Sequence, residues 1–329
     1  MASSSLLQIE NLSVQFDTDE GTVRAVDGVS LDIRRGEVLG LVGESGCGKS
    51  VTALSVLRLI PSPPGRIATG RILFHGDDLL QLPIARLRAV RGRGISMIFQ
   101  EPMTALSPLH RIGAQLVETL QFHRDISREE AWRIGADWLR KVGIPDPAER
   151  MLAYPHELSG GMSQRVMIAM ALMLDPELVI ADEPTTALDV TIQAQVFDLM
   201  RAMRSKDTSL LLITHNMGVV WEMCTRVAVM YASEIVEVAD RDDIFNRPLH
   251  PYTEALIATI PPVAGDCKRL ETIPGQVPSP QAYPTGCRFR DRCRYAFTRC
   301  AAEHPPLYDI EGRLARCFLR DPIAQIKSA

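Results

Sequence analysis

Residues 38–50 read VLGLVGESGCGKS, a short apolar run followed by a glycine-rich loop and the dipeptide Lys-Ser. A continuous apolar run of this length is typical of a strand buried on both faces of a parallel sheet. The loop matches the pattern G-x-x-x-x-G-K-[ST], which is informative only when a strand precedes it and a helix follows it. Both neighbours are predicted here, so the sequence indicates a strand, a phosphate-binding loop and a helix in that order.

The residues of this loop suit the phosphates of a nucleotide. Its glycines allow the backbone to curl so that several N–H groups face phosphate oxygens, and the following helix adds the positive end of its dipole. Lys49 can reach the β- and γ-phosphates, and the hydroxyl of Ser50 can ligate Mg²⁺. The candidate contacts are Gly43, Glu44, Ser45, Gly46, Cys47, Gly48, Lys49 and Ser50.

Two further apolar runs end in residues that can serve the same chemistry. Residues 178–181 precede Asp182 and Glu183, so one carboxylate can hold Mg²⁺ while the next polarises an attacking water. Residues 210–213 lie just before His215, at the carboxyl end of a predicted parallel strand, where the ligands of such sheets bind. The simpler alternatives are an ordinary helix N-terminus for the two acids and a structural role for the histidine.

The composition narrows the class of protein. The chain has 329 residues, of which 46% are hydrophobic and 23% charged, enough apolar material for a sizeable core. Lysine and arginine number 36 against 40 acidic residues, and the net charge of −4 gives no support for a nucleic-acid-binding surface. No apolar run approaches the roughly 18 residues that a bilayer span needs, and the N-terminus lacks the features of a signal peptide. We therefore expect a chain that stays in the cytosol.

The proline and cysteine content of the chain changes near residue 245, where we place a domain boundary. The last 83 residues contain 11 of the 22 prolines and five of the seven cysteines, which predicts a loop-rich C-terminal region. Before it, apolar strands alternate with helical periodicity, so the expected fold class is α/β with a parallel sheet covered on both faces. Residues 70–75 are expected to add an antiparallel strand, and residues 101–175 to be mostly helical.

Together these features resemble the ATP-binding subunits of ABC transporters over most of residues 7–245. The deciding motif is Leu158–Arg165, LSGGMSQR, which is similar to the signature loop of that family. In the family two subunits pair head to tail, and each signature loop closes over the ATP held by its partner. The resemblance implies a P-loop ABC ATPase core in residues 1–245, with a parallel sheet, an antiparallel β-subdomain and a helical subdomain at about 101–175. It also implies hydrolysis of ATP with Mg²⁺.

The resemblance assigns roles to single residues as well. It makes Glu183, His215 and Gln100 catalytic, and Gln100 also transmits closure to the permeases. Phe16 falls where the family stacks an aromatic ring on adenine. The other implied roles are Mg²⁺ ligation by Ser50, Gln100 and Asp182, and contacts across the dimer from Ser159, Gly160, Gly161, Gln164 and, in the segment Thr186–Asp189, Asp189. Two residues depart from common family choices, Met162 for Gln and Asn216 for Asp, and neither removes a group with an assigned role.

The C-terminal extension, residues 246–329, narrows the family. Residues 247–253 (RPLHPYT), Gly286-Cys287 and the later cysteines are similar to the C-terminal region of oligopeptide and dipeptide importer ATPases, of the dipeptide-permease D-subunit type. The resemblance implies ATP hydrolysis that energises import of di- and oligopeptides from the cytoplasmic face of the inner membrane. The implied partners are a second homologous ATPase, two transmembrane permease subunits and a separate extracytoplasmic substrate-binding protein, with no nucleic acid.

Other functions stay open at this point. The same subgroup includes importers of nickel, and cargo contacts the permeases and the binding protein rather than the ATPase. An ATPase that serves an exporter fits the C-terminal extension less well. A soluble ABC ATPase acting on nucleic acid or ribosomes would show salt-dependent binding to DNA or RNA, which the acidic net charge disfavours.

Four late cysteines form a candidate metal site. Cys287, Cys293, Cys300 and Cys317 have the spacing C-x5-C-x6-C-x16-C, and four thiolates can bind Zn²⁺ or a [4Fe–4S] cluster. The tight C-x2–4-C pairs of structural zinc sites are absent. Members of the resembled family carry an iron–sulfur cluster at similar cysteines, which implies a structural [4Fe–4S] cluster here, with zinc or unligated thiols as alternatives. Cations between the cysteines would offset the charge of a cluster, and these are Arg288, Arg290, Arg292, Arg294 and Arg299.

Overall fold

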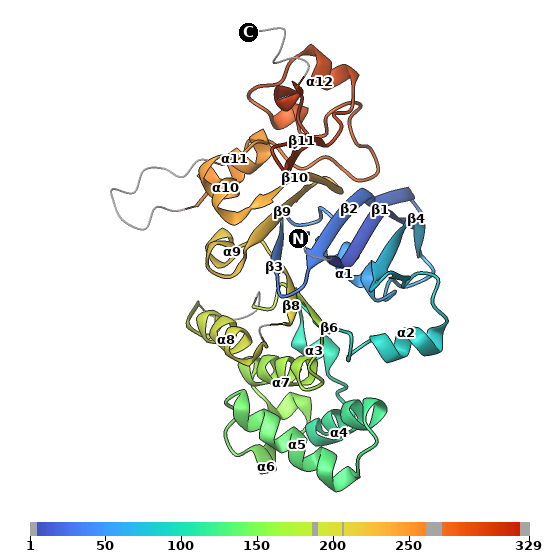
Figure 1. Ribbon diagram of the computed structural model, residues 1–329, viewed down its shortest axis with the longest axis vertical. Coiled ribbons are helices and arrows are strands. Elements are labelled where there is room, and N and C mark those ends of the chain that lie inside the picture. Colours follow the sequence, from blue (N-terminus) through green and yellow to red (C-terminus); the bar gives the residue numbers. More distant parts are fainter. Residues whose placement is uncertain (1–4, 186–189, 206, 261–271, 323–329) are drawn as a thin grey trace. The chain divides into compact units, whose positions relative to one another are not determined.

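The structure, a computed structural model, describes residues 5–185, 190–205, 207–260 and 272–322 (Figure 1). By its internal contacts the chain divides into two compact units. The first comprises Met1–Gln81 and Ile213–Ala329, and the second comprises Leu82–Leu212. The phosphate-binding loop and the C-terminal extension therefore belong to the same unit.

The N-terminal part of the first unit is an antiparallel sheet in the order β2-β1-β4-β5. Apolar residues of β1 such as Leu7, Ile9, Leu12 and Val14 are buried, as a strand with one face on a core requires. An irregularity between Ile9 and Leu12 shifts the alternation by one residue. The bounds are β1 Ser5–Thr18, β2 Gly21–Arg34, β4 Gly65–Phe74 and β5 Asp77–Asp78. The antiparallel strand predicted at residues 70–75 is confirmed as the end of β4, which pairs with β1.

Five strands of a second sheet lie in this unit, in the order β11-β12-β10-β9-β3. β3 (Val38–Val42), the strand predicted before the glycine-rich loop, is buried at every position and runs parallel to β9 (Arg226–Tyr231). β10 (Glu234–Asp240) returns antiparallel to β9. Its other edge pairs with β12 (Arg313–Ala315), which in turn pairs with β11 (Tyr308–Ile310). Two short strands of the C-terminal extension thus lengthen the sheet of the preceding core.

The helices of the first unit are short. They are α1 Lys49–Val56, α9 Met217–Met223, α10 Arg241–Asn246, α11 Pro251–Ala258 and α12 Thr298–Ala302, with 3-10 turns η2 Arg290–Arg292 and η3 Phe318–Arg320. α1 directly follows the glycine-rich loop, as predicted. The boundary predicted at residue 245 falls inside α10.

The second unit combines parallel strands with most of the helices. β6 (Ile95–Ile98) runs parallel to β7 (Leu178–Asp182), and β8 (Ser209–Thr214) follows β7 in the strand order. All three strands are buried at every position, which agrees with strands covered on both faces. The helices are α2 Ile84–Val90, α3 Pro102–Ala105, α4 Ile112–His123, α5 Arg128–Lys141, α6 Pro147–Arg150, η1 Pro155–Glu157, α7 Gly160–Leu172 and α8 Val190–Met203.

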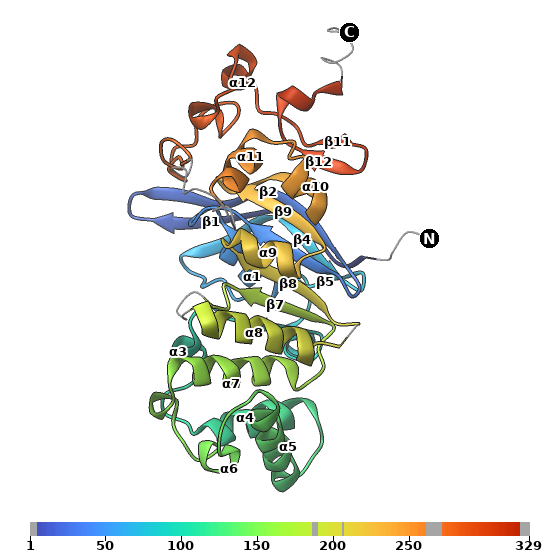
Figure 2. The ribbon, with the colours of Figure 1, turned by 90° about the vertical axis from the view of Figure 1, so that its left-hand side faces the viewer.

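The segment 101–175 is mostly helical, as predicted. Within the second unit α7 lies between α8 on one side and α4 and α5 on the other (Figure 2). Ser127 caps the start of α5 by accepting a hydrogen bond of 3.1 Å from the backbone of Glu130. Across the described ranges, no helix has both the length and the apolar character that crossing a bilayer would require.

Candidate nucleotide-binding site

Two glycines of the loop at residues 43–50, Gly43 and Gly48, are required by their surroundings. A Cβ atom on Gly43 would lie 2.1 Å from the carbonyl oxygen of Met230, and one on Gly48 would lie 2.2 Å from that of Ala25. No side chain fits at either distance. Gly48 also has a left-handed backbone, with φ of 106°, where it caps the start of α1. The loop is therefore held tightly between β2 and β9, and its curled form is built into the fold.

Lys49 is fixed inside this loop. Its side chain is buried, and Nζ donates hydrogen bonds of 2.8 Å to the carbonyl oxygen of Gly43 and 3.0 Å to that of Glu44. The first turn of α1 contains no acidic residue, so its N–H groups and the ammonium form one positive region. This arrangement suits a bound triphosphate.

Cys47 is completely buried at the base of the loop. Burial raises the pKa of its thiol, and the nearby Lys49 opposes this only in part. A neutral, inaccessible thiol is a poor nucleophile, so Cys47 fills space in the loop.

His215 and Phe16 also belong to the first unit. His215 follows β8 and is exposed. The next residue, Asn216, caps α9 by accepting hydrogen bonds of 2.9 Å from the backbone of Gly218 and 3.3 Å from that of Val219. The departure noted at this position thus has a structural role. Phe16 is half-buried in β1 with its ring over Gly65, since a Cβ there would lie 2.8 Å from Cε1 of Phe16.

In the second unit, Gln100, Asp182 and Glu183 follow neighbouring strands. β6 and β7 are parallel, with Ile98 opposite Ala181. These three residues therefore lie at the carboxyl ends of two adjacent strands. Asp182 is buried, whereas Gln100 is exposed. Glu183 has a positive φ of 43°, a strained conformation for a residue with a side chain. Such strain is characteristic of functional sites.

The predicted signature loop caps α7. Ser159 accepts a hydrogen bond of 3.3 Å from the backbone of Met162, and both Ser159 and Gly160 are exposed at the helix N-terminus. Gln164 differs from the others of this group, because its side chain is only 1% exposed. It does not reach the surface that Ser159 and Gly160 present. Asp189, like the rest of Thr186–Asp189, lies outside the described residues.

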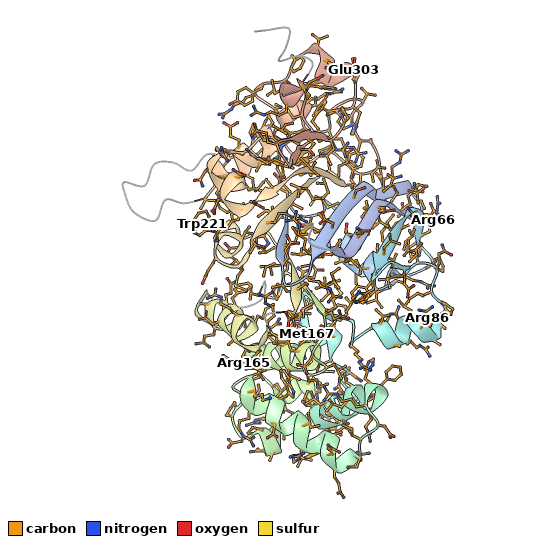
Figure 3. The ribbon with its side chains drawn as sticks, in the orientation of Figure 1. Arg66, Arg86, Arg165, Met167, Trp221 and Glu303 are labelled. Carbon is orange, nitrogen blue, oxygen red and sulfur yellow. The ribbon has the colours of Figure 1, made fainter. Side chains whose placement is uncertain are left out.

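Arg165 ties the start of α7 to the rest of the second unit (Figure 3). Its guanidinium donates hydrogen bonds of 2.7 Å to the carbonyl oxygen of Val142 and 2.8 Å to the side chain of Gln195. These partners come from the end of α5 and from α8. These two hydrogen bonds hold α7, and with it the exposed N-terminus of this helix, against its neighbours.

The four late cysteines line one cavity in the first unit, together with His250, Phe289 and Phe318. The cavity contains about 310 Å³ of space that protein atoms do not fill, part of it open to solvent. Cys300 and Cys317 are buried, and Cys287 and Cys293 are half-buried. Burial raises the pKa of the Cys287 thiol to about 12 and that of Cys317 to about 11. In the part of the chain that is described, no three Cys, His, Asp or Glu side chains converge closely enough to hold a single metal ion.

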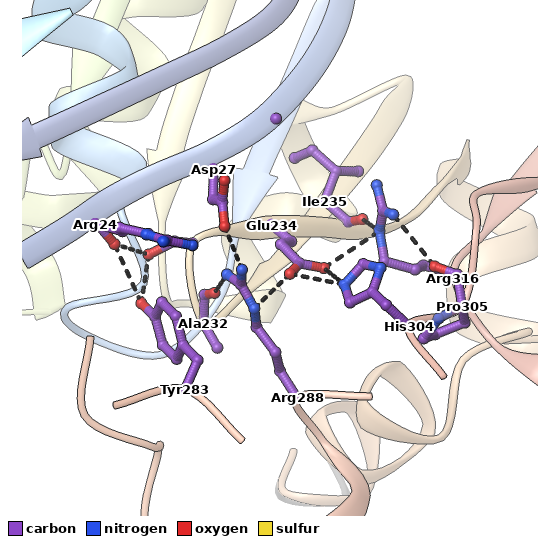
Figure 4. A network of polar contacts seen from close by, with 12 residues as sticks. Arg24, Asp27, Ala232, Glu234, Ile235, Tyr283, Arg288, His304, Pro305 and Arg316 are labelled. Carbon is purple, nitrogen blue, oxygen red and sulfur yellow. Dashed lines mark hydrogen bonds and ion pairs between the residues drawn. The ribbon is translucent and has the colours of Figure 1, made fainter. Parts of the chain in front are cut away.

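The arginines beside these cysteines have partners that the sequence did not indicate. Arg288, next to Cys287, forms ion pairs with Asp27 and Glu234, and Glu234 also contacts His304 and Arg316, the neighbour of Cys317 (Figure 4). The other pairs are Arg290 with Asp291, Arg292 with Glu44, Arg294 with Glu254, and Arg299 with Asp321. The expectation that these charges are directed at a cluster is corrected, because carboxylates already balance them. Their positions tie the cysteine-bearing loops to the core.

The most informative contact that sequence reasoning missed is at Glu44. The two terminal nitrogens of the Arg292 guanidinium donate to the Glu44 carboxylate, at 2.9 and 3.1 Å. The backbone N–H of Glu44 donates to the hydroxyl of Tyr252 at 2.9 Å. Tyr252 and Arg292 are distant from residue 44 in the sequence. In the sequence, the motif at residues 247–253 and the late cysteines indicated functional residues in the C-terminal extension, but neither pointed to Glu44.

A curled loop that can hold phosphates, an antiparallel sheet beside a parallel one and a helical segment with an exposed glycine-rich N-terminus define an ATP-binding cassette. Solved structures agree with this class at the level of the fold. The chain is similar to the cassette MJ0796 in a dimeric post-hydrolysis state bound to ADP and Pi, with a TM-score of 0.64 at 24% identity over 71% of this chain and 98% of that one.

Comparison with known sequences defines the family more closely. Residues 26–186 match the model of the ABC transporter family, and residues 236–300 match that of the oligopeptide/dipeptide transporter C-terminal region. The chain is 48% identical to a probable peptide ABC transporter ATP-binding protein of Sinorhizobium fredii, over 98% of this chain and 97% of the relative. It is 48% identical to the oligopeptide transport ATP-binding protein AppD of Bacillus subtilis, over 96% and 97%. It is 46% identical to the dipeptide transport ATP-binding protein DppD of Escherichia coli, over 95% and 96%. The chain belongs to the ATP-binding proteins of the oligopeptide/dipeptide ABC transporter family.

Proposed function

We infer that this chain is the ATP-hydrolysing subunit that energises import of di- or oligopeptides through an ABC transporter. The observation that carries this function is similarity along nearly the whole chain, including the C-terminal extension, to ATP-binding proteins of peptide transporters. The loop at residues 43–50 supplies the binding chemistry that such a subunit needs. Nickel is the second candidate cargo. Importers of nickel belong to the same subgroup, and the ATPase subunit is not the part of such a transporter that contacts the cargo.

The residues that would bind the phosphates and the adenine lie in the first unit. Lys49 and the N–H groups at the start of α1 would hold the β- and γ-phosphates, and Phe16 would stack on the adenine. The residues that fit Mg²⁺ are oxygen donors, Ser50, Gln100 and Asp182, as this cation prefers. Mg²⁺ when bound would neutralise charge on the phosphates.

The hydrolytic step assigns one role to each polar residue at the strand ends. Glu183 would accept a proton from the attacking water, and His215, exposed after β8, would orient the water or contact the γ-phosphate. Ser159 and Gly160, which are exposed, and the half-buried Gly161 at the start of α7 would bind the ATP held by a second subunit, with Asp189 alongside. Gln164, being buried, would support this surface from within α7.

The partners follow from the same roles. A signature loop that serves the nucleotide of another chain requires a second homologous ATPase. Coupling to import requires two transmembrane permease subunits, and a separate extracytoplasmic protein would deliver the peptide. The chain would then be bound at the cytoplasmic face of the inner membrane through the permeases.

The cavity lined by the four late cysteines supports the proposal that the protein binds a [4Fe–4S] cluster. Four cysteines line one cavity, and four thiolates are the usual ligands of a [4Fe–4S] cluster. Their spacing also lacks the tight C-x2–4-C pairs that structural zinc sites use. Cys287, Cys293, Cys300 and Cys317 would hold it, and it would supply a structural cross-link in a region with little core of its own.

The function is tested by reconstitution of the tagged chain with the membrane proteins that co-purify with it. We expect two permeases and a second ATPase, and ATP hydrolysis in proteoliposomes that rises when peptide-loaded binding protein is added. Stimulation by Ni²⁺ with no response to peptide would transfer the assignment to a metal importer. Recovery of ribosomes or nucleic acid without any membrane protein would contradict the transporter function.

A further inference from the structure

The C-terminal extension contacts the phosphate-binding loop through one arginine. The Arg292 side chain is 6% exposed and forms a two-pronged ion pair with Glu44, with distances of 2.9 and 3.1 Å. Its Nε donates a hydrogen bond of 2.8 Å to the carbonyl oxygen of Pro274, and its guanidinium lies near the ring of Tyr231. All three nitrogens of the guanidinium donate hydrogen bonds, and these bonds together fix its position.

A tyrosine of the same extension holds the other side of Glu44. The Tyr252 hydroxyl accepts a hydrogen bond of 2.9 Å from the backbone N–H of Glu44. Tyr252 is fully buried, with its ring 4.6 Å from that of Tyr231 and 5.5 Å from that of Phe289. Its own backbone N–H donates to Nδ1 of His250. The backbone and the carboxylate of Glu44 are thus both fixed by residues of the extension.

The position of Glu44 bears directly on Lys49. The carbonyl oxygens of Gly43 and Glu44 accept the hydrogen bonds of Lys49 Nζ, so the peptide unit that the extension holds also orients this lysine. In addition, an unpaired carboxylate in the loop would repel a triphosphate. Arg292 balances that charge at a site that is partly shielded from water.

We propose that Arg292 and Tyr252 are positioning residues for nucleotide binding, and that the extension sets the conformation and the charge of the phosphate-binding loop through Glu44. This inference rests on the proposed ATPase function. It predicts an order among variants that simple loss of structure would not produce.

The test measures the Kd of Mg-ATP for the full chain in complex with its partners. Arg292→Gln leaves the Glu44 charge unpaired, and we expect Kd to rise about tenfold. Glu44→Gln removes both the ion pair and the repulsion, so we expect its Kd to rise less than that of Arg292→Gln. The double variant should regain most of the affinity lost in Arg292→Gln. Because the cause is charge, the defect of Arg292→Gln should shrink as salt is raised.

Two further variants separate positioning from folding. Arg294→Gln is the matched control, since Arg294 stands two residues away, is exposed and pairs with Glu254 instead of Glu44, and we expect its Kd to equal the wild-type value. Tyr252→Phe keeps the packed ring and removes only the acceptor, and we expect Kd to rise about threefold. If Arg292→Gln does not fold, Tyr252→Phe carries the test.

The possible results distinguish failure of the proposed ATPase function from failure of the role of the extension. A wild-type complex that does not bind Mg-ATP at all would overturn the proposed function. Normal ATP binding by the wild type, together with an unchanged Kd in both Arg292→Gln and Tyr252→Phe, would overturn only the role of the extension. Additive losses in the Glu44→Gln, Arg292→Gln double variant would also contradict it, because no shared charge interaction would then exist.

Discussion

The backbone N–H of Cys287 donates a hydrogen bond of 2.8 Å to the carbonyl oxygen of Cys300, which fixes the first and third of the late cysteines side by side. Gly286 permits this approach, since a Cβ on it would lie 2.3 Å from that same oxygen. The backbone therefore brings the thiols of Cys287 and Cys300 to the same cavity.

Replacement of one thiol should remove a bound cluster. For Cys293→Ser purified without oxygen, we expect iron and acid-labile sulfide to fall to background, with loss of the broad visible absorbance of an iron–sulfur protein. Cys224→Ala is the control, because Cys224 is buried elsewhere in the first unit. Elemental analysis settles the alternatives, and zinc in place of iron in the wild type would replace the cluster assignment.

Glu183 should separate binding from hydrolysis. We expect Glu183→Gln to reduce ATP turnover by about 10²–10⁴, the usual contribution of a general base, with ATP affinity unchanged. Asp175→Asn is the matched control in the same unit, because Asp175 is exposed and its pair with Arg124 spans 3.8 Å. Turnover at the wild-type rate in Glu183→Gln would remove this residue from the role of base.

The ion pairs of Arg288 should contribute strongly to stability. Its side chain is 11% exposed and that of Glu234 is 6% exposed, so Arg288→Gln leaves a buried carboxylate with one partner fewer (Figure 4). We expect the free energy of unfolding to fall by about 3 kcal/mol, measured in urea. Arg66→Gln, at an exposed pair with Asp17 on the antiparallel sheet (Figure 3), should change it by less than about 1 kcal/mol. Equal effects in the two variants would contradict this account.

Glu37 should give the stability a pH dependence of known sign. Burial raises the pKa of Glu37 above its ordinary value of 4.5, against the hydrogen bond from the Arg34 backbone and the charge of Arg226. The folded protein then binds more protons at this site than the unfolded chain, so this site's contribution to stability falls as pH rises from about 4.5. Glu37→Gln should therefore gain stability relative to the wild type between pH 4.5 and 7. Urea unfolding at several pH values measures this, and a constant difference would refute it.

Local spacing was enough to predict the loop at residues 43–50, because the chemistry of phosphate binding is carried by consecutive residues. The strands before Asp182 and His215 were predictable for a similar reason, since a continuous buried run leaves a strong apolar signal.

Contacts between distant residues were not predictable in this way. Arg292 and Glu44 are separated by most of the chain, and nothing in either neighbourhood indicates the other. The charge of Arg288 suggested a cluster nearby, whereas its partners Asp27 and Glu234 lie on β2 and β10. The burial of Gln164 depends on which face of α7 packs inward, and the helices beside it decide that.

Strands β11 and β12 were also missed, because three residues are too few to show an alternating pattern. Their pairing with β10 has a consequence for any shortened form of the protein. A chain cut after the apparent cassette would present β10 as a bare outer strand, with open N–H and C=O groups ready to join the same strand of another molecule. We expect such a fragment to self-associate into insoluble material. We therefore expect the extension and the cassette to need expression as one piece.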